Sequence, residues 1–267
     1  MTIIHAFLLG ILQGLTEFIP VSSTAHLLIV QKLLAIPADD RVFSFLVLVQ
    51  MGTLLSLIVY FWKDGLAIIR DMFRKPVTFN HRLGWYIVLA TIPALAAGLL
   101  LKDAVEALFQ NPLLEAGIRL SISAALLTLA ERLGKRQRTL ESKNWKDALF
   151  VGFMQILAIF PGASRSGTTI SAGMLRGFDR PSAARFAFLM SVPVMLAAGA
   201  YESLDLLKMT NLGSFLPLLA AGFITAAVVG WLAIRWLLNF LGRRSLYWFA
   251  AYCALAGAAC LILFFSG

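Results

Sequence analysis

The sequence predicts an all-α polytopic membrane protein with six transmembrane helices and two re-entrant helical hairpins, arranged as an inverted two-fold repeat. Three observations predict this fold. First, 60% of the 267 residues are hydrophobic and 14% are charged, whereas soluble domains are about 45–50% apolar and about 25% charged. Second, six stretches are apolar over the length of about 20 residues that a bilayer requires. Third, two further apolar regions are interrupted by polar residues.

The six predicted spans cover residues 42–62, 84–101, 113–133, 183–202, 214–238 and 246–265. The two interrupted regions, 3–35 and 146–176, each contain a proline and a cluster of hydroxyl and charged residues near the middle. Each half of these regions is too short to cross a bilayer, so we expect each region to enter the membrane and return. Non-helical backbone at that depth needs protein or water to satisfy its polar groups.

The order of one hairpin followed by three spans occurs twice. A pattern of Gln, Pro and Ser supports a repeat. It occurs at Gln13, Pro20 and Ser23 and again at Gln155, Pro161 and Ser164, with Gln and Pro one residue closer in the second copy. Because each half has an odd number of spans, the second half must be inserted in the opposite direction, as in many transporters. The sequence therefore predicts one integral membrane domain, 1–267, with a first repeat at 1–134 and a second, inverted repeat at 146–267.

Lys and Arg are divided unequally between the two predicted sides of the membrane. Of the 23 Lys and Arg, seventeen lie in segments that share one side, at 63–82, 132–146, 176–185 and 235–244. Five lie on the other side, and Arg165 lies inside the second hairpin. Cytoplasmic loops carry the excess of positive charge, so both termini and the mouth of the first hairpin should face outward. The net charge of +9 thus orients the chain and does not indicate a nucleic-acid partner.

The first candidate site lies in the first hairpin. Gln13 and Glu17 are four residues apart and share one face of a helix, which Pro20 should end. Ser23 and His26 lie near the first turn of the next helix. A carboxylate, a hydroxyl and an imidazole are therefore predicted to converge there.

Two interpretations of this segment compete. In the structural one, Ser22 and Ser23 only cap the second helix, while Glu17 and His26 pair with each other. In the functional one, these groups form a site, because ionisable groups at membrane depth are costly and are usually functional. The proximity of a Glu and a His favours the functional interpretation.

The second candidate site begins the returning helix of the second hairpin. Arg165 is the only cation there, and two glycines allow a tight turn beside four hydroxyl residues, Ser164, Ser166, Thr168 and Thr169. Backbone N–H groups, a helix dipole, hydroxyls and a guanidinium make a phosphate cradle. The alternative is that Arg165 reaches the membrane interface, which the glycines and hydroxyls argue against. The segment is not a Walker loop, because the Gly-Lys-Ser/Thr ending is missing.

These two motifs resemble those of the undecaprenyl-diphosphatases of the bacterial inner membrane, also called bacitracin-resistance proteins. That family carries an acid-or-Gln, three residues, Glu pattern that leads into Pro-Val-Ser-Ser-Thr-(small)-His, and a Pro-Gly-x-Ser-Arg-Ser-x-x-Thr segment. The matching segments here are Gln13 to Glu17, Pro20 to His26 and Pro161 to Thr169. The resemblance covers nearly the whole chain. The sequence departs from it at Gln13, where some members have a second Glu, and at Ala25, where others have Gly.

The resemblance implies hydrolysis of the terminal phosphate of a C55 polyprenyl diphosphate lipid at a site that opens to the outer face, which recycles the carrier for cell-wall synthesis and gives bacitracin resistance. It implies catalytic roles for Glu17, Ser23, His26 and Arg165. The substrate-binding residues it implies are Ser22, Thr24, Ser164, Ser166 and Thr169. It also implies a divalent cation, Mg²⁺ or Ca²⁺. Gln13 and Glu17 would be too few ligands, so diphosphate oxygens and water would complete the shell.

The sequence leaves the nucleophile open. Ser23 could attack with His26 as its base, or His26 could attack directly and form a phosphohistidine. Ser23 is favoured, since Glu17 and His26 could then share the proton transfers.

Other functions and the assembly are also open at this point. A polyprenyl-phosphate flippase or transporter would suit the inverted repeat but needs no nucleophile. A lipid phosphatase with two catalytic histidines is disfavoured because no second His lies in the motifs. A homodimer is the assembly considered.

Overall fold

The computed structural model describes residues 1–37, 39–74, 77–101, 111–159, 163–206 and 212–266, without the side chains of 40, 201–206, 212 and 214. This part of the chain is helical, with eleven α-helices and one short 3-10 helix, η1 (Leu140–Ser142). Several residues on which the sequence analysis depends lie outside the described part. They are three of the lysines counted for the orientation, Lys75, Lys102 and Lys208, and two residues of the second motif, Pro161 and Gly162.

Within the described ranges, six helices are long and apolar enough to cross a membrane, which confirms the predicted number of spans. These helices are α3 (Asp40–Tyr60), α5 (Phe79–Leu100), α7 (Pro112–Leu133), α10 (Arg180–Leu206), α11 (Leu212–Leu241) and α12 (Tyr247–Ser266). The largest shift at the start of a span is in α5, which begins five residues before the predicted position. The Thr78 side chain caps α5 by accepting a hydrogen bond from the His81 N–H at 3.2 Å, a polar start that hydropathy does not reveal.

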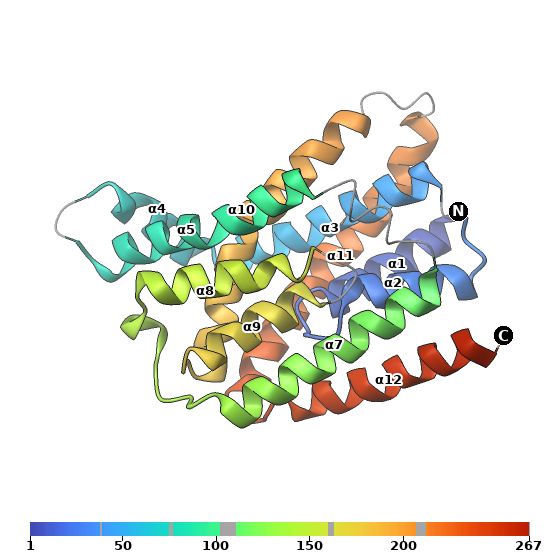
Figure 1. The fold of residues 1–267 in the computed structure, drawn as a ribbon. Helices are drawn as coiled ribbons and strands as arrows, with labels where there is room; N and C mark the ends of the chain where they lie inside the picture. The colour runs from blue at the N-terminus through green and yellow to red at the C-terminus, as the bar shows by residue number, and fades with distance from the viewer. Residues whose placement is uncertain (38, 75–76, 102–110, 160–162, 207–211, 267) are drawn as a thin grey trace.

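Two pairs of shorter helices lie where the hairpins are predicted. These pairs are α1 (Ile3–Thr16) with α2 (Ser23–Leu33), and α8 (Trp145–Ile156) with α9 (Arg165–Leu175). The longest of the four has 14 residues and measures about 21 Å at 1.5 Å per residue, short of the roughly 30 Å hydrocarbon core. In Figure 1 the first pair opens toward the end with the termini, and the second pair opens toward the opposite end.

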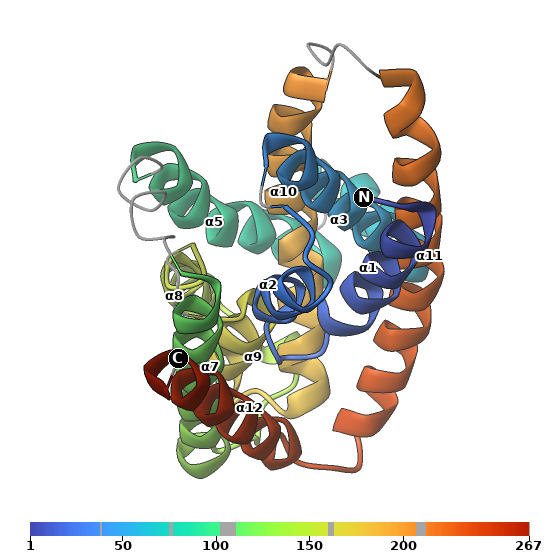
Figure 2. The ribbon, with the colours of Figure 1, turned by 90° about the vertical axis from the view of Figure 1, so that its right-hand side faces the viewer.

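The two ends of the bundle differ in charge. Both termini lie at one end, which faces the viewer in Figure 2, while α4 (Trp62–Met72) and the segment between α7 and α8 lie at the other end. There Asp147 accepts hydrogen bonds from Arg138 at 2.6 Å and from Arg176 at 2.7 Å. Burial raises the pKa of Asp147, but the hydrogen bonds from these two guanidinium groups outweigh it and hold the pKa below its usual value. The ion pair of Arg138 holds the segment between α7 and α8 against the start of α8, and that of Arg176 joins the end of α9 to the same carboxylate.

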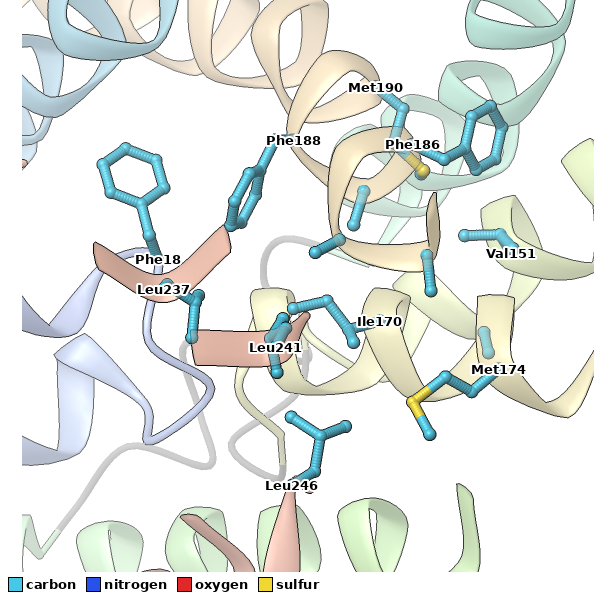
Figure 3. Close-up of a cluster of buried hydrophobic side chains, with 14 of the residues drawn as sticks. Phe18, Val151, Ile170, Met174, Phe186, Phe188, Met190, Leu237, Leu241 and Leu246 are labelled. Carbon is cyan, nitrogen blue, oxygen red and sulfur yellow. The ribbon is translucent and has the colours of Figure 1, made fainter. Parts of the chain in front are cut away.

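The apolar core supports the turn between α1 and α2. Phe18, in that turn, packs edge-on against Phe188 of α10, with ring centroids 5.5 Å apart. Figure 3 shows this pair beside Leu237 of α11 and Ile170 of α9, all of which are buried. Because Phe18 is fixed by this packing, the preceding residue, Glu17, is fixed as well.

Glycines bring α1 into close contact with α11. A Cβ atom added at Gly14 would lie 2.8 Å from the Val229 Cβ and 2.9 Å from the Ala226 carbonyl oxygen. A Cβ at Gly10 would lie 2.6 Å from the Gly222 carbonyl oxygen. Small residues allow such backbone contact between membrane helices, and here they set the position of the α1 end that carries Glu17.

We expect Gly14→Ala to lower the thermal unfolding temperature of the purified protein and to reduce its activity. The added methyl group must displace the α11 backbone, and overpacking of this kind costs about 1–3 kcal/mol. The matched control is Gly98→Ala in α5, where nothing lies within 4 Å of the added atom. The control should be neutral or slightly stabilising. Equal unfolding temperatures for the two variants would contradict a close α1–α11 contact.

Candidate functional site

The carboxylate of Glu17 is the centre of a buried hydrogen-bond cluster, with the residue 5% exposed. Its Oε2 accepts hydrogen bonds from Gln13 Nε2 at 2.7 Å and from Ser23 Oγ at 2.8 Å. Its Oε1 accepts one from Gln50 Nε2 at 3.1 Å and pairs with Nη2 of Arg165. A carboxylate offers about four lone-pair positions, so this one is fully used.

The cluster joins segments that lie far apart in the sequence. Glu17 follows α1, and Ser23 is the first residue of α2, whereas Arg165 is the first residue of α9. The Ser166 hydroxyl also donates to the Ile19 carbonyl oxygen at 3.3 Å. The two predicted motifs therefore meet, each at a helix N-terminus, where backbone N–H groups and the helix dipole favour an anion.

Ser22 holds the turn between α1 and α2 in an unusual conformation. Its φ of 66° and ψ of 94° lie where residues with a Cβ are rarely found. Its buried side chain caps α2 by accepting a hydrogen bond from the Ala25 N–H at 3.4 Å. The structure thus gives this predicted substrate-binding residue a capping role, and places backbone strain of about 1–3 kcal/mol beside the site.

We expect Ser22→Gly to be more stable than Ser22→Ala in thermal unfolding of the purified proteins. Alanine loses the cap, at a cost of about 0.5–2 kcal/mol, and keeps the Cβ that makes this φ unfavourable. Glycine adopts positive φ without strain. If the alanine variant were the more stable of the two, the left-handed turn would not be present in the membrane.

His26 has partners for both ring nitrogens, and neither partner is Glu17 or Ser23. Nδ1 lies 2.8 Å from the Ser22 carbonyl oxygen, and Nε2 lies 2.6 Å from the Tyr252 hydroxyl in α12. Because a carbonyl oxygen only accepts, Nδ1 carries the hydrogen and Nε2 accepts from the tyrosine. The structure brings Ser23 to Glu17, as predicted, but holds His26 away from both, so the suggested Glu17–His26 pair is not formed.

The second motif shapes the start of α9. Ser164 caps the helix by accepting a hydrogen bond from the Gly167 N–H at 3.2 Å, and its hydroxyl lies 3.1 Å from that of Ser166. The Ser164 N–H donates to Ser123 Oγ of α7 at 3.2 Å. These bonds orient the turn that presents Arg165.

Three other hydroxyls of the motifs lie differently. Thr169 is buried and donates to the Arg165 carbonyl oxygen at 2.8 Å, so its hydroxyl is satisfied within the helix. Thr168 is fully buried, and its hydroxyl has no hydrogen-bond partner among the described residues. Thr24 is exposed at the start of α2. Of the predicted substrate-binding hydroxyls, Ser164 and Ser166 lie nearest in sequence to Arg165 and share its turn.

Sequence reasoning missed three contributors to the site. Gln50, Ser123 and Tyr252 each lie inside an apolar span, without a motif around them. The available signal was the presence of a polar side chain within a predicted span, where such groups usually face the protein interior.

The described residues do not fit a divalent cation held by the protein alone. No group of three or more His, Cys, Asp or Glu side chains is placed to bind a metal in the described ranges. The Glu17 carboxylate is occupied by four donors, and the Gln13 and Gln50 amides point their nitrogens at it. Mg²⁺ and Ca²⁺ need six or more oxygen ligands, which this arrangement does not supply.

Comparison with known proteins places the chain in a family. The family model described as bacitracin resistance protein BacA matches residues 6–259. A relative in Anaeromyxobacter dehalogenans, named undecaprenyl-diphosphatase, is 44% identical over all of this chain and 93% of its own length. Relatives of the same name in Mycobacterium marinum and Moorella thermoacetica are 41% and 40% identical, over 97% and 99% of this chain and 93% and 98% of their own. The chain therefore belongs to the bacitracin resistance protein BacA family.

Proposed function

We infer that this protein is a membrane phosphatase that hydrolyses undecaprenyl diphosphate to undecaprenyl phosphate and inorganic phosphate. The names of relatives that match almost the whole chain support this activity. The observation that carries the chemistry is the contact of Ser23 Oγ and Arg165 with the same buried carboxylate, Glu17. A flippase needs no serine hydrogen-bonded to a base. The relatives, moreover, carry the name of a hydrolase. The activity recycles the lipid carrier for cell-wall synthesis and gives resistance to bacitracin.

In the first step, Ser23 Oγ attacks the terminal phosphorus, and Glu17 Oε2, 2.8 Å away, takes the hydroxyl proton. A bond forms between Oγ and phosphorus, and the bond from phosphorus to the bridging oxygen breaks. The electron pair stays on undecaprenyl phosphate, the leaving group. The Arg165 guanidinium has five N–H donors, so it can hold Glu17 and still donate to the phosphoryl oxygens in the transition state.

In the second step, water attacks the phosphoserine, and the bond between phosphorus and Ser23 Oγ breaks. Glu17 returns its proton to Oγ, and inorganic phosphate leaves. His26, one helical turn from Ser23, accepts the proton of the water at Nε2, because Nδ1 is held by the Ser22 carbonyl oxygen. His26 then passes this proton to the departing inorganic phosphate, so Glu17 and His26 both return to their starting protonation states in each turnover.

We further propose that the two short helix pairs are re-entrant hairpins and that the halves 1–134 and 146–267 are inverted repeats. The opposite openings of the pairs in Figure 1 support this arrangement. The gathering of basic segments at the end opposite the termini supports termini that face outward, with the site open to the outer face of the bacterial inner membrane.

We propose that Mg²⁺ or Ca²⁺ reaches the site on the diphosphate, since the protein alone does not fit it. Titration calorimetry of the purified protein with either metal alone should then show no binding at micromolar concentration. Binding should appear when a non-hydrolysable diphosphate lipid is present. Tight binding of metal to the protein alone would contradict this proposal.

The proposed function is tested by phosphate release from undecaprenyl diphosphate by purified protein, with and without a chelator. If the folded protein moved the lipid across the vesicle membrane but released no phosphate, the protein would be a flippase and not a hydrolase. The predicted homodimer is checked by native mass spectrometry from detergent.

A further inference from the structure

His26 connects the site to the outer surface of the bundle. The Tyr252 ring stacks on the imidazole with centroids 5.7 Å apart and planes 11° apart, and its hydroxyl lies 2.6 Å from Nε2. Tyr252 is nevertheless 47% exposed on α12, a candidate span. The imidazole therefore lies between Ser23, one turn away on α2, and a surface that faces lipid.

The part of α12 around Tyr252 touches the turn of the first helix pair. The neighbouring Cys253 is buried, and its Sγ lies 3.7 Å from the Pro20 carbonyl oxygen. Both α2 and α12 pack against α7. Tyr252 is thus fixed at the depth of the catalytic turn.

The exposed face of α12 at this depth is apolar. Trp248 lies four residues before Tyr252 and Leu255 three residues after it, so the three share one face, with Trp248 65% and Leu255 75% exposed. The whole helix contains no charged residue. This stripe can therefore hold a hydrocarbon chain beside the site.

A diphosphate bound between Ser23 and Arg165 is attached to a chain that has to pass from the buried site into the bilayer. We propose that the isoprenoid chain leaves the site between α2 and α12, across the ring of Tyr252, and that the Tyr252 hydroxyl positions His26 until the hydrolytic water replaces it. This inference rests on the proposed function and adds a positioning residue and the binding site of the lipid chain.

The kinetic test compares Tyr252→Phe with Tyr252→Ala on undecaprenyl diphosphate and on the short, soluble farnesyl diphosphate. Loss of the hydroxyl alone should lower kcat about five- to tenfold on both substrates and leave KM unchanged. Loss of the ring should also raise KM for the long substrate at least about tenfold, with KM for farnesyl diphosphate unchanged. The matched controls Tyr247→Phe and Tyr247→Ala, on the same helix, should behave as wild type.

Each outcome decides one part of the proposal. Wild-type kcat in Tyr252→Phe would overturn the positioning role. An equal rise in KM for the long and short substrates in Tyr252→Ala would overturn the chain exit.

A second measurement does not depend on catalysis. Benzoylphenylalanine at position 255 should photo-crosslink to undecaprenyl diphosphate in lipid nanodiscs, and excess unlabelled substrate should suppress the crosslink. The same probe at Leu232, an exposed position of α11, should give no suppressible crosslink. Equal behaviour at both positions would refute the exit. The probe at position 255, in an otherwise unchanged protein, could give a suppressible crosslink while the protein releases no phosphate. That result would support the chain exit and contradict the proposed hydrolase function.

Discussion

Glu17→Gln is expected to lower the rate of phosphate release by about 10³-fold, within the range for loss of a general base. Glutamine cannot take the Ser23 proton, and its amide nitrogen would face the donors that now surround the carboxylate. Ser23→Ala should lose a similar factor. The double variant should be little worse than either single one, because residues that act as a unit are strongly non-additive.

The matched control for this result is Glu115→Gln. Glu115, in α7, is also a buried carboxylate that pairs with an arginine, Arg119, at 2.7 Å, but it lies outside the cluster. It should retain near wild-type turnover in single-turnover phosphate release. Multiplicative losses in the Glu17 and Ser23 double variant would show that the two groups act in separate steps.

The same variants distinguish the two candidate nucleophiles. Acid-quenched single-turnover reactions should trap a phosphoserine, which is stable in acid, and Ser23→Ala should abolish it. His26→Ala should also slow turnover by orders of magnitude, with the phosphoserine accumulating because its hydrolysis lacks a base. An acid-labile phosphohistidine in the Ser23→Ala variant would instead make His26 the nucleophile.

Arg165→Lys is expected to lower kcat/KM by about 10²- to 10³-fold while the protein stays folded. Lysine keeps the charge but loses the planar set of donors that can hold a carboxylate and a phosphate together. Arg119→Lys is the matched control, since Arg119 also pairs with a buried glutamate. Thermal unfolding of both variants separates a local defect from general instability. An effect of Arg165→Lys below about threefold, under 1 kcal/mol, would show that Arg165 does not bind the transferred phosphoryl group.

Much of the fold could be predicted because hydropathy reports spans directly. All six spans were found, and the short helices at the two motifs follow from their prolines and hydroxyl residues. The contact of Ser23 with Glu17 lies within one pair of consecutive short helices, where sequence spacing is informative. The partner of His26 could not be found, because Tyr252 is 226 residues away and its position depends on how α12 packs against α7. The positive φ of Ser22 likewise depends on tertiary packing and not on local propensity.

The pairing of Glu17 with Arg165 has a consequence for how the protein is made. The two residues are 148 positions apart, so during translation the first helix pair is made before the cationic partner of Glu17 has left the ribosome. Until then the carboxylate lacks its cationic partner, and an unpaired charge at that depth is costly. The site is therefore completed only after the second helix pair has been made and has packed against the first. A chain interrupted before that point would contain Glu17 without Arg165, the cation that pairs with it in the complete protein.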